Sequence, residues 1–181
     1  MSFIYVGRLD ELKGIRTLFE AWRLMGSDAP LLKVCGTGSL QEWCIHQSEG
    51  QNIEMMGFLD SATVKRLLSE SQALILPTLW YEGFPMTIAE AFSSGVPVIC
   101  SDIGNAGSLI EEGVTGWKFA VGNAEELVHA VQRCMASRDD MRRGIIKRYE
   151  SEYTPDANYR RLAEIYAEVQ NANRSAGAQR R

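Results

Sequence analysis

This sequence of 181 residues is poor in histidine, cysteine and proline, and it lacks any long apolar run. No apolar run approaches the roughly 18 residues of a membrane-spanning helix, and the first residues show no signal-peptide pattern. The two histidines have no partner at metal-ligand spacing, which argues against a zinc site or histidine-based catalysis. The net charge of −4 argues against a nucleic-acid-binding surface, which would need to be basic.

The four cysteines are widely spaced and form no CxxC pair. Two of them, Cys35 and Cys100, lie in apolar strand-like runs, where cysteine behaves as a small hydrophobic residue. We therefore expect reduced, structural cysteines in a reducing compartment, and hence a cytoplasmic location. The other two cysteines are Cys44 and Cys134.

Strand-like and helix-like segments alternate along the chain. Apolar runs that suit buried parallel strands are Phe3–Val6, Leu31–Cys35, Ile53–Met56, Ala73–Leu76 and Val98–Cys100, with a weaker candidate at Gly116–Phe119. Helices are predicted at 15–25, 39–49, 61–69, from Asn123 onward, at 139–149 and at 155–171. Ser39 and Glu42 have the spacing of a capping box, and Pro155 suits the first turn of a helix.

This alternation predicts an α/β fold, a Rossmann-like open parallel sheet with helices on both faces. The length suits one domain, which we assign to residues 1–171. The remaining tail, 172–181, is small, polar and aperiodic, and we expect it to be disordered.

The most informative stretch runs from Trp80 to Phe92 and places Glu82 and Glu90 with seven residues between them. A strand, a loop with glycine and proline, and a helix put free backbone N–H groups at the carboxyl edge of a sheet, where α/β proteins hold phosphates. Carboxylates repel phosphate but accept hydrogen bonds from sugar hydroxyls. This layout fits a nucleotide sugar, although Glu90 alone could also be a solvated surface glutamate.

A second group of candidates follows the first predicted strand. Gly7 allows a tight exit from the strand, after which Arg8 and Lys13 can both reach over the carboxyl edge of the sheet. Two cations there would neutralise a diphosphate and stabilise it as a leaving group. The alternative is two solvated charges on a surface loop.

Two further strand ends carry glycine. Gly36 belongs to a GxG pattern that lacks the third glycine of a dinucleotide fingerprint, since Gln41 stands there. It either lets the backbone approach a nucleotide or forms a tight turn. After Gly57, the backbone of Phe58 or Leu59 either reads the edge of a base or forms a simple turn.

These motifs resemble the retaining glycosyltransferases of family 4 over about residues 3 to 170. The order and spacing of several separate motifs agree. They are Gly7-Arg8 with Lys13-Gly14, Gly36, Gly57, Glu82-Gly83-Phe84-Pro85 with Glu90, residues 94–102 and residues 111–117. The resemblance implies one half of a two-domain GT-B enzyme, namely the carboxyl-terminal, donor-binding domain, which would transfer a hexosyl group to an acceptor in carbohydrate biosynthesis.

The resemblance also implies a role for each matching residue. Arg8 and Lys13 would bind the diphosphate, Glu82 would bind hydroxyls of the donor sugar, and Glu90 would bind the ribose. The backbone from Gly83 to Thr87, which includes Phe84, Pro85 and Met86, would hold sugar and phosphate. Members of the family generally need no DxD metal site and this sequence has none, so we expect no metal and no cofactor besides the UDP- or GDP-sugar donor.

Two features depart from the family pattern. Ser108 stands where the family often has a glutamate. The amino-terminal domain, which supplies the acceptor site, is missing, so we expect a partner domain in cis or in trans and poor activity of this chain by itself. We expect membrane contact only through that domain, which leaves open a peripheral location of the complete enzyme at the inner membrane.

Other functions remain open at this point. Another GT-B enzyme, such as a sugar-nucleotide epimerase or a phosphorylase, would lack this full set of motifs. A non-catalytic α/β module that binds a nucleotide is the alternative from a different class. A dinucleotide binder should have the third glycine and an acidic residue at the end of the second strand, where this chain has Cys35-Gly36.

Overall fold

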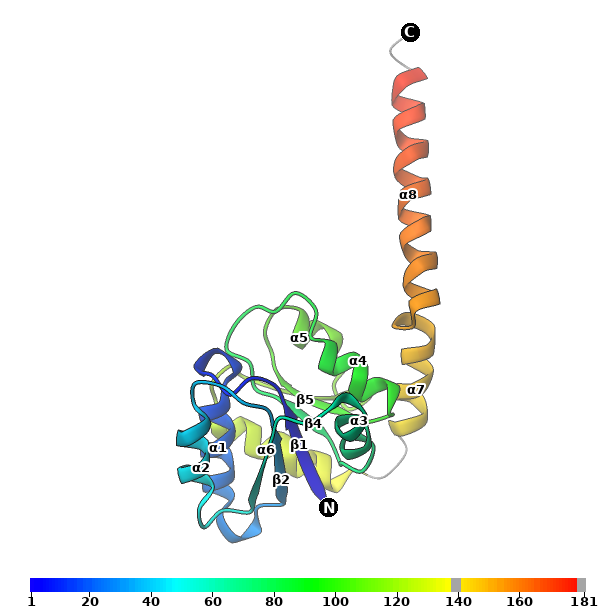
Figure 1. Ribbon diagram of the computed structural model, residues 1–181. Helices are drawn as coiled ribbons and strands as arrows, with labels where there is room; N and C mark the ends of the chain where they lie inside the picture. The colour runs from blue at the N-terminus through cyan, green and yellow to red at the C-terminus, as the bar shows by residue number, and fades with distance from the viewer. Residues whose placement is uncertain (138–140, 179–181) are drawn as a thin grey trace.

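The computed structural model describes residues 1–137 and 141–178, and its centre is a parallel sheet in the strand order β3-β2-β1-β4-β5-β6 (Figure 1). All strand pairs are parallel. The sequence-based prediction of the strands is confirmed with small shifts at their ends. The strands are β1 (Ser2–Val6), β2 (Leu31–Cys35), β3 (Ile53–Gly57), β4 (Leu74–Leu76), β5 (Val98–Ser101) and β6 (Gly116–Phe119).

The sheet has an apolar core on each face, because successive side chains of a strand point to opposite sides. In β1, Phe3 and Tyr5 enter one core, whereas Ile4 enters the other. β5 behaves in the same way, with Ile99 on the first side and Cys100 on the second. Both faces therefore need a covering layer of helices.

The helices supply these layers, which confirms the predicted fold class. One face is covered by α1 (Ile15–Met25), α2 (Gln41–Ser48) and α6 (Ala124–Ala136). The other is covered by α3 (Ser61–Ser69), α4 (Met86–Ser93), α5 (Gly104–Leu109) and the first part of α7 (Met141–Glu152). Figure 1 shows α1, α2 and α6 on one side and α3, α4 and α7 on the other. Two 3₁₀ turns flank α1, η1 (Glu11–Lys13) and η2 (Gly26–Asp28).

Side-chain caps explain where α3 and α6 begin, and a contact with another loop explains why the predicted start of α2 was wrong. Asp60 accepts a hydrogen bond from Thr63 N at the start of α3, and Asn123 accepts one from Glu126 N at the start of α6. The capping box predicted at Ser39 does not form, because α2 begins at Gln41 without a side-chain cap. The N–H of Leu40 instead donates to Leu9 O at 2.8 Å, which holds this turn on the β1–α1 loop.

The last two helices differ from their predicted bounds. The predicted start of α7 at Asp139 lies outside the described residues, and the helix ends at Glu152 rather than Tyr149. Helix α8 (Pro155–Ala178) begins with Pro155 as expected and continues past the predicted end at Asn171. It projects away from the sheet (Figure 1), and its residues from 158 to 170 are exposed. Residues 179–181 of the expected tail lie outside the described part.

Among the described helices, none is both long enough and apolar enough to span a bilayer. All four cysteines are buried and free of disulfide bonds. Burial raises the pKa of Cys35 and Cys44 to about 11. It raises the pKa of Cys100 and Cys134 to about 12. Because the folded state favours the neutral thiol, this contribution to stability is present below the ordinary pKa of 9.0 and is lost as the pH rises through these values.

We expect the native thiols to react slowly with an aromatic disulfide reagent at neutral pH, since the reactive thiolate is suppressed and the sulfur atoms are inaccessible. The urea-unfolded chain should release four equivalents from its four cysteines. The free energy of unfolding should decrease between pH 9.0 and about 12. Rapid modification of all four thiols in the native chain would contradict this burial.

Candidate functional site

The candidate site lies where the strand order reverses, at the carboxyl ends of β1 and β4. These two strands are neighbours in the sheet, but the chain leaves β1 for α1 on one face and leaves β4 for α4 on the other. The two connections leave for opposite faces at this point, which is where open α/β sheets bind ligands. The loop after β1 carries Arg8 and Lys13, and the loop after β4 carries Glu82.

The structure brings Lys13 and Glu82 together, although 69 residues separate them in the sequence. Lys13 Nζ donates to Glu82 Oε1 at 2.9 Å. The two side chains are only 19% and 12% exposed, respectively, so the pair is partly shielded from water. The sequence predicts separate partners for these two residues, a diphosphate and a sugar, whereas the structure pairs them with each other.

Backbone contacts hold the two loops against each other. Leu79 N donates to Leu12 O at 2.9 Å. Gly14 has a φ of 69° and packs on the carbonyl of Pro77 so closely that a Cβ on Gly14 would lie 1.7 Å from that oxygen. Only glycine combines this left-handed conformation with this close approach. The position of Lys13 beside Glu82 is therefore fixed by the backbone.

Asp10 and Tyr5, to which the sequence analysis gave no role in the site, both contact Arg8. The Arg8 guanidinium lies 3.1 Å from Asp10, which also accepts a hydrogen bond from Lys13 N and so caps η1. The buried Tyr5 hydroxyl donates to Arg8 O at 2.6 Å. Burial, together with the nearby Asp10 carboxylate, raises the pKa of Tyr5 far above its ordinary range, so the hydroxyl keeps its proton. A capping aspartate before a short turn is a local signal that could have revealed Asp10, whereas Tyr5 shows no such signal.

A third loop contacts the glutamate loop from the other side. The side-chain amide of Asn105 donates to the carbonyl oxygen of Gly83. The ring of Tyr81 packs so close to Gly104 that a Cβ on that glycine would lie 2.7 Å from it. The residues on either side of Glu82, Tyr81 and Gly83, are therefore both held by contacts with this third loop. Nothing local in the sequence indicates this role for Asn105.

The amino terminus of α4 lies at the same edge of the sheet. Pro85 is its N-cap residue and no side chain caps the helix, so the N–H groups of Met86 and Thr87 are available to an anion. Phe84 and Met86 are exposed, whereas Pro85 is buried. Glu90 lies one turn further along, exposed between the buried Ala89 and Ala91, and the described residues offer it no ion pair.

The strand-end glycines have a structural role that is visible without a ligand. Gly7 N donates to Cys35 O at 3.0 Å and Gly36 N donates to Gly57 O at 2.7 Å, which links three strand ends. Gly36 has a φ of 141°, and a Cβ there would lie 1.8 Å from Gly7 O. The geometry directly supports the tight-turn interpretation, and the approach of a nucleotide remains a prediction. Phe58 is 82% exposed and Leu59 is partly buried.

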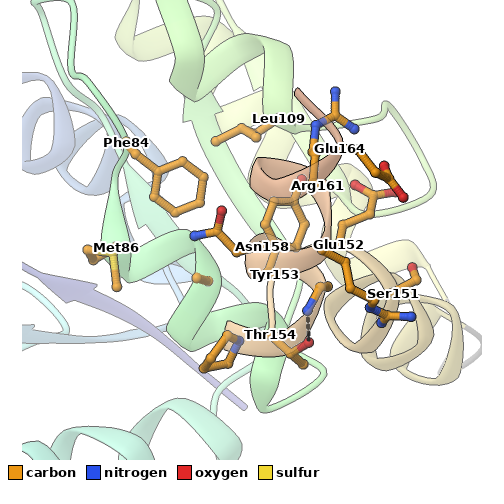
Figure 2. Close-up of a pocket in the computed structure, with 14 residues that line it drawn as sticks. Phe84, Met86, Leu109, Ser151, Glu152, Tyr153, Thr154, Asn158, Arg161 and Glu164 are labelled. Carbon is orange, nitrogen blue, oxygen red and sulfur yellow. Dashed lines mark hydrogen bonds between the residues drawn. The ribbon is translucent and has the colours of Figure 1, made fainter. Parts of the chain in front are cut away.

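A cavity of about 1120 Å³ lies beside the amino terminus of α4. Figure 2 shows Phe84 and Met86 on one side of it and Tyr153, Asn158 and Arg161 of the α7–α8 region on the other. Arg8, Lys13 and Glu82 are all absent from its lining. We take the charged site at the strand reversal as the candidate, because Lys13 and Glu82 form a partly shielded ion pair there.

No group of three or more histidine, cysteine, aspartate or glutamate residues within 1–137 and 141–178 is arranged to hold a metal ion.

Comparison with protein families decides the broad class of this chain. The profile of the family described as Glycosyl transferases group 1 matches residues 2–151. The chain belongs to this family. The match disfavours the alternative of a non-catalytic nucleotide-binding module.

Individual relatives agree with the family. This group 1 domain is 28% identical over 179 residues to the amylovoran biosynthesis glycosyltransferase AmsK of Erwinia amylovora, covering 91% of this chain and 44% of the relative. It is 31% identical over 137 residues to the glycogen synthase of Mycobacterium tuberculosis, covering 72% of this chain and 33% of that protein.

Solved structures share the fold. The lipopolysaccharide outer core galactosyltransferase WaaB matches with a TM-score of 0.75 and 27% identity, over 92% of this chain and 49% of WaaB. HepE of Anabaena, solved in complex with UDP, matches with a TM-score of 0.81 and 19% identity, over 92% of this chain and 48% of HepE. The group 1 domain therefore spans less than half the length of these relatives, and it has the fold of one half of a GT-B enzyme.

We expect Gly36→Ala to lower the free energy of unfolding by more than about 3 kcal/mol, because the new methyl group collides with backbone that cannot move alone. Gly50→Ala is the matched control, since Gly50 also has a positive φ, of 75°, but nothing lies within 4 Å of its Cβ position. That control should cost only about 1–2 kcal/mol. Urea denaturation measures both variants, and equal losses would contradict the close contact between Gly36 and Gly7.

Proposed function

We propose that this group 1 domain is the donor-binding, carboxyl-terminal half of a retaining, family 4 hexosyltransferase. The observation that carries the proposal is the meeting of Lys13 and Glu82 beside the uncapped terminus of α4, at the reversal of the strand order. A cation and a helix terminus suit a diphosphate, and a fixed carboxylate suits a sugar hydroxyl. One ligand that contains both groups is a nucleotide sugar.

Each residue has a role in this proposal. Arg8, Lys13 and the first N–H groups of α4 bind the diphosphate, and Glu82 accepts a hydrogen bond from the sugar. When the bond between the sugar and the diphosphate breaks, the electron pair moves onto the diphosphate, and these donors stabilise the charge that develops there. Glu90, exposed one turn into α4, binds the ribose, and the strand ends near Gly36, Phe58 and Leu59 face the base.

Structural neighbours support UDP as the first nucleotide to test. HepE of Anabaena has been solved with UDP and with UDP-glucose. Its identity to this chain is low, so GDP-sugars remain in the test. No metal ion has a role in this proposal, because the cations and helix N–H groups supply the positive charge.

The proposal includes a second half that carries the acceptor site. Helix α8 supports this, because it presents an exposed apolar stripe that nothing described in this chain covers. The exposed apolar residues of this stripe are Tyr159, Leu162, Ile165, Tyr166 and Val169. Their spacing of three or four residues, with Ile165 and Tyr166 adjacent, places them on one side of the helix. The proposed location is the cytoplasm, which suits four free thiols.

We expect Arg8→Ala combined with Lys13→Ala to weaken binding of UDP or GDP by about 1.5–3 kcal/mol for each charged hydrogen bond lost. Isothermal calorimetry with UDP, GDP and ADP measures the effect. Arg23→Ala is the matched control, because Arg23 lies in the last turn of α1, at the far end of that helix from Lys13, and pairs with Glu20. Equal affinity of the double variant and the wild type would refute the diphosphate site.

This chain alone should bind its donor but transfer little sugar, because alignment of donor and acceptor contributes roughly 7–11 kcal/mol to such reactions. Adding the amino-terminal half of the full-length enzyme as a separate chain should restore transfer of radiolabelled sugar. Leu162→Asp with Tyr166→Asp should block this restoration without changing UDP affinity. Glu164→Gln, on the opposite side of α8, is the control. Rapid transfer by the isolated chain would show that the acceptor site lies within these residues.

A further inference from the structure

Both cations assigned to the diphosphate are paired with a carboxylate. Arg8 lies 3.1 Å from Asp10, and Lys13 lies 2.9 Å from Glu82. The two pairs differ in exposure, since the Arg8 side chain is 68% exposed and the Lys13 side chain is 19% exposed. Water screens the first pair strongly and the second pair much less. The second pair is therefore the one that a ligand must overcome.

A diphosphate that approaches Lys13 also approaches Glu82. The ammonium group has three donors, so Lys13 can reach a phosphate either by sharing or by leaving Glu82. In both cases the carboxylate stays close to the phosphate, and two negative charges in a partly shielded site repel each other. Glu82 therefore opposes the binding of a bare diphosphate.

Contacts on both sides of Glu82 oppose a movement of its loop away from the phosphate. The loop is bonded on one side through Leu79 N to Leu12 O, and on the other side through the Asn105 amide to Gly83 O. The Glu82 side chain turns more readily than this loop moves. Its second oxygen, Oε2, accepts no hydrogen bond from the described residues and can accept one from a ligand.

We propose that Glu82, through its competition for Lys13, makes the site discriminate between the donor and the spent nucleoside diphosphate. The donor brings sugar hydroxyls that donate to Glu82 and replace the hydrogen bond from Lys13. The spent diphosphate brings no such donor and leaves Glu82 as an unsatisfied charge beside it, which favours release of the product. This inference rests on the proposed donor site.

The test is Glu82→Gln, which keeps the shape of the side chain and removes its charge. Calorimetry uses inorganic pyrophosphate, which tests the diphosphate site without a base, and the pairs UDP with UDP-glucose and GDP with GDP-mannose. We expect pyrophosphate and the free nucleotide to bind the variant roughly threefold to tenfold more tightly than the wild type. The nucleotide sugar should gain less or lose affinity, so the preference for donor over product should fall.

Two variants show whether the effect passes through Lys13. In a Lys13→Met background, Glu82→Gln should strengthen the binding of pyrophosphate less than it does beside Lys13, because the competition for Lys13 is gone and only the direct repulsion remains. Glu90→Gln should weaken nucleotide and nucleotide sugar to the same degree and leave pyrophosphate unchanged, since the ribose is common to the first two.

The outcomes separate the two proposals. If the wild type binds a nucleotide and Glu82→Gln leaves pyrophosphate and free nucleotide equally tight or weaker, the competition is refuted and the donor site stands. The same gain in the Lys13→Met background would also refute it. If the wild type binds none of these ligands, the donor site is refuted together with the inference that rests on it.

Discussion

The close approach of two loops at the centre of the sheet determines the rest of the site. Gly14 packs against the carbonyl of Pro77, and Leu79 bonds to Leu12. A Cβ at position 14 would lie 1.7 Å from that oxygen, so any side chain there would push the loops apart and weaken the contact between Lys13 and Glu82. Their pairing thus depends on glycine at this position.

The sheet topology makes this approach possible. Parallel strands buried on both faces bring β1 and β4 side by side, although β2 and β3 lie between them in the sequence. α1 and α4 leave these two strands for opposite faces. The place of the site is a direct consequence of the strand order, and its chemistry follows from the few residues placed at the strand ends.

Local patterns in the sequence predicted the strands, because short apolar runs suit only buried parallel strands here. They also predicted the starts of α3 and α6, where Asp60 and Asn123 cap their own helices. The prediction at Ser39 was wrong because a contact from Leu9, thirty residues away, determines that turn. For the same reason the sequence could not reveal Tyr5, Asn105 or the pairing of Lys13 with Glu82, since each acts through a neighbour in space.

Both charged and apolar groups are left open to water in this domain. The site at the strand reversal holds paired charges and helix N–H groups, which keep their strength only where water is partly excluded. The domain alone does not exclude it, because Arg8 and Met86 are largely exposed. The cavity beside Phe84, whose lining mixes apolar and charged side chains, reaches the amino terminus of α4 at Met86. The proposed second half, if it covered this terminus, would also shield the donors to the diphosphate, so one docking event would strengthen the electrostatic contacts to the ligand.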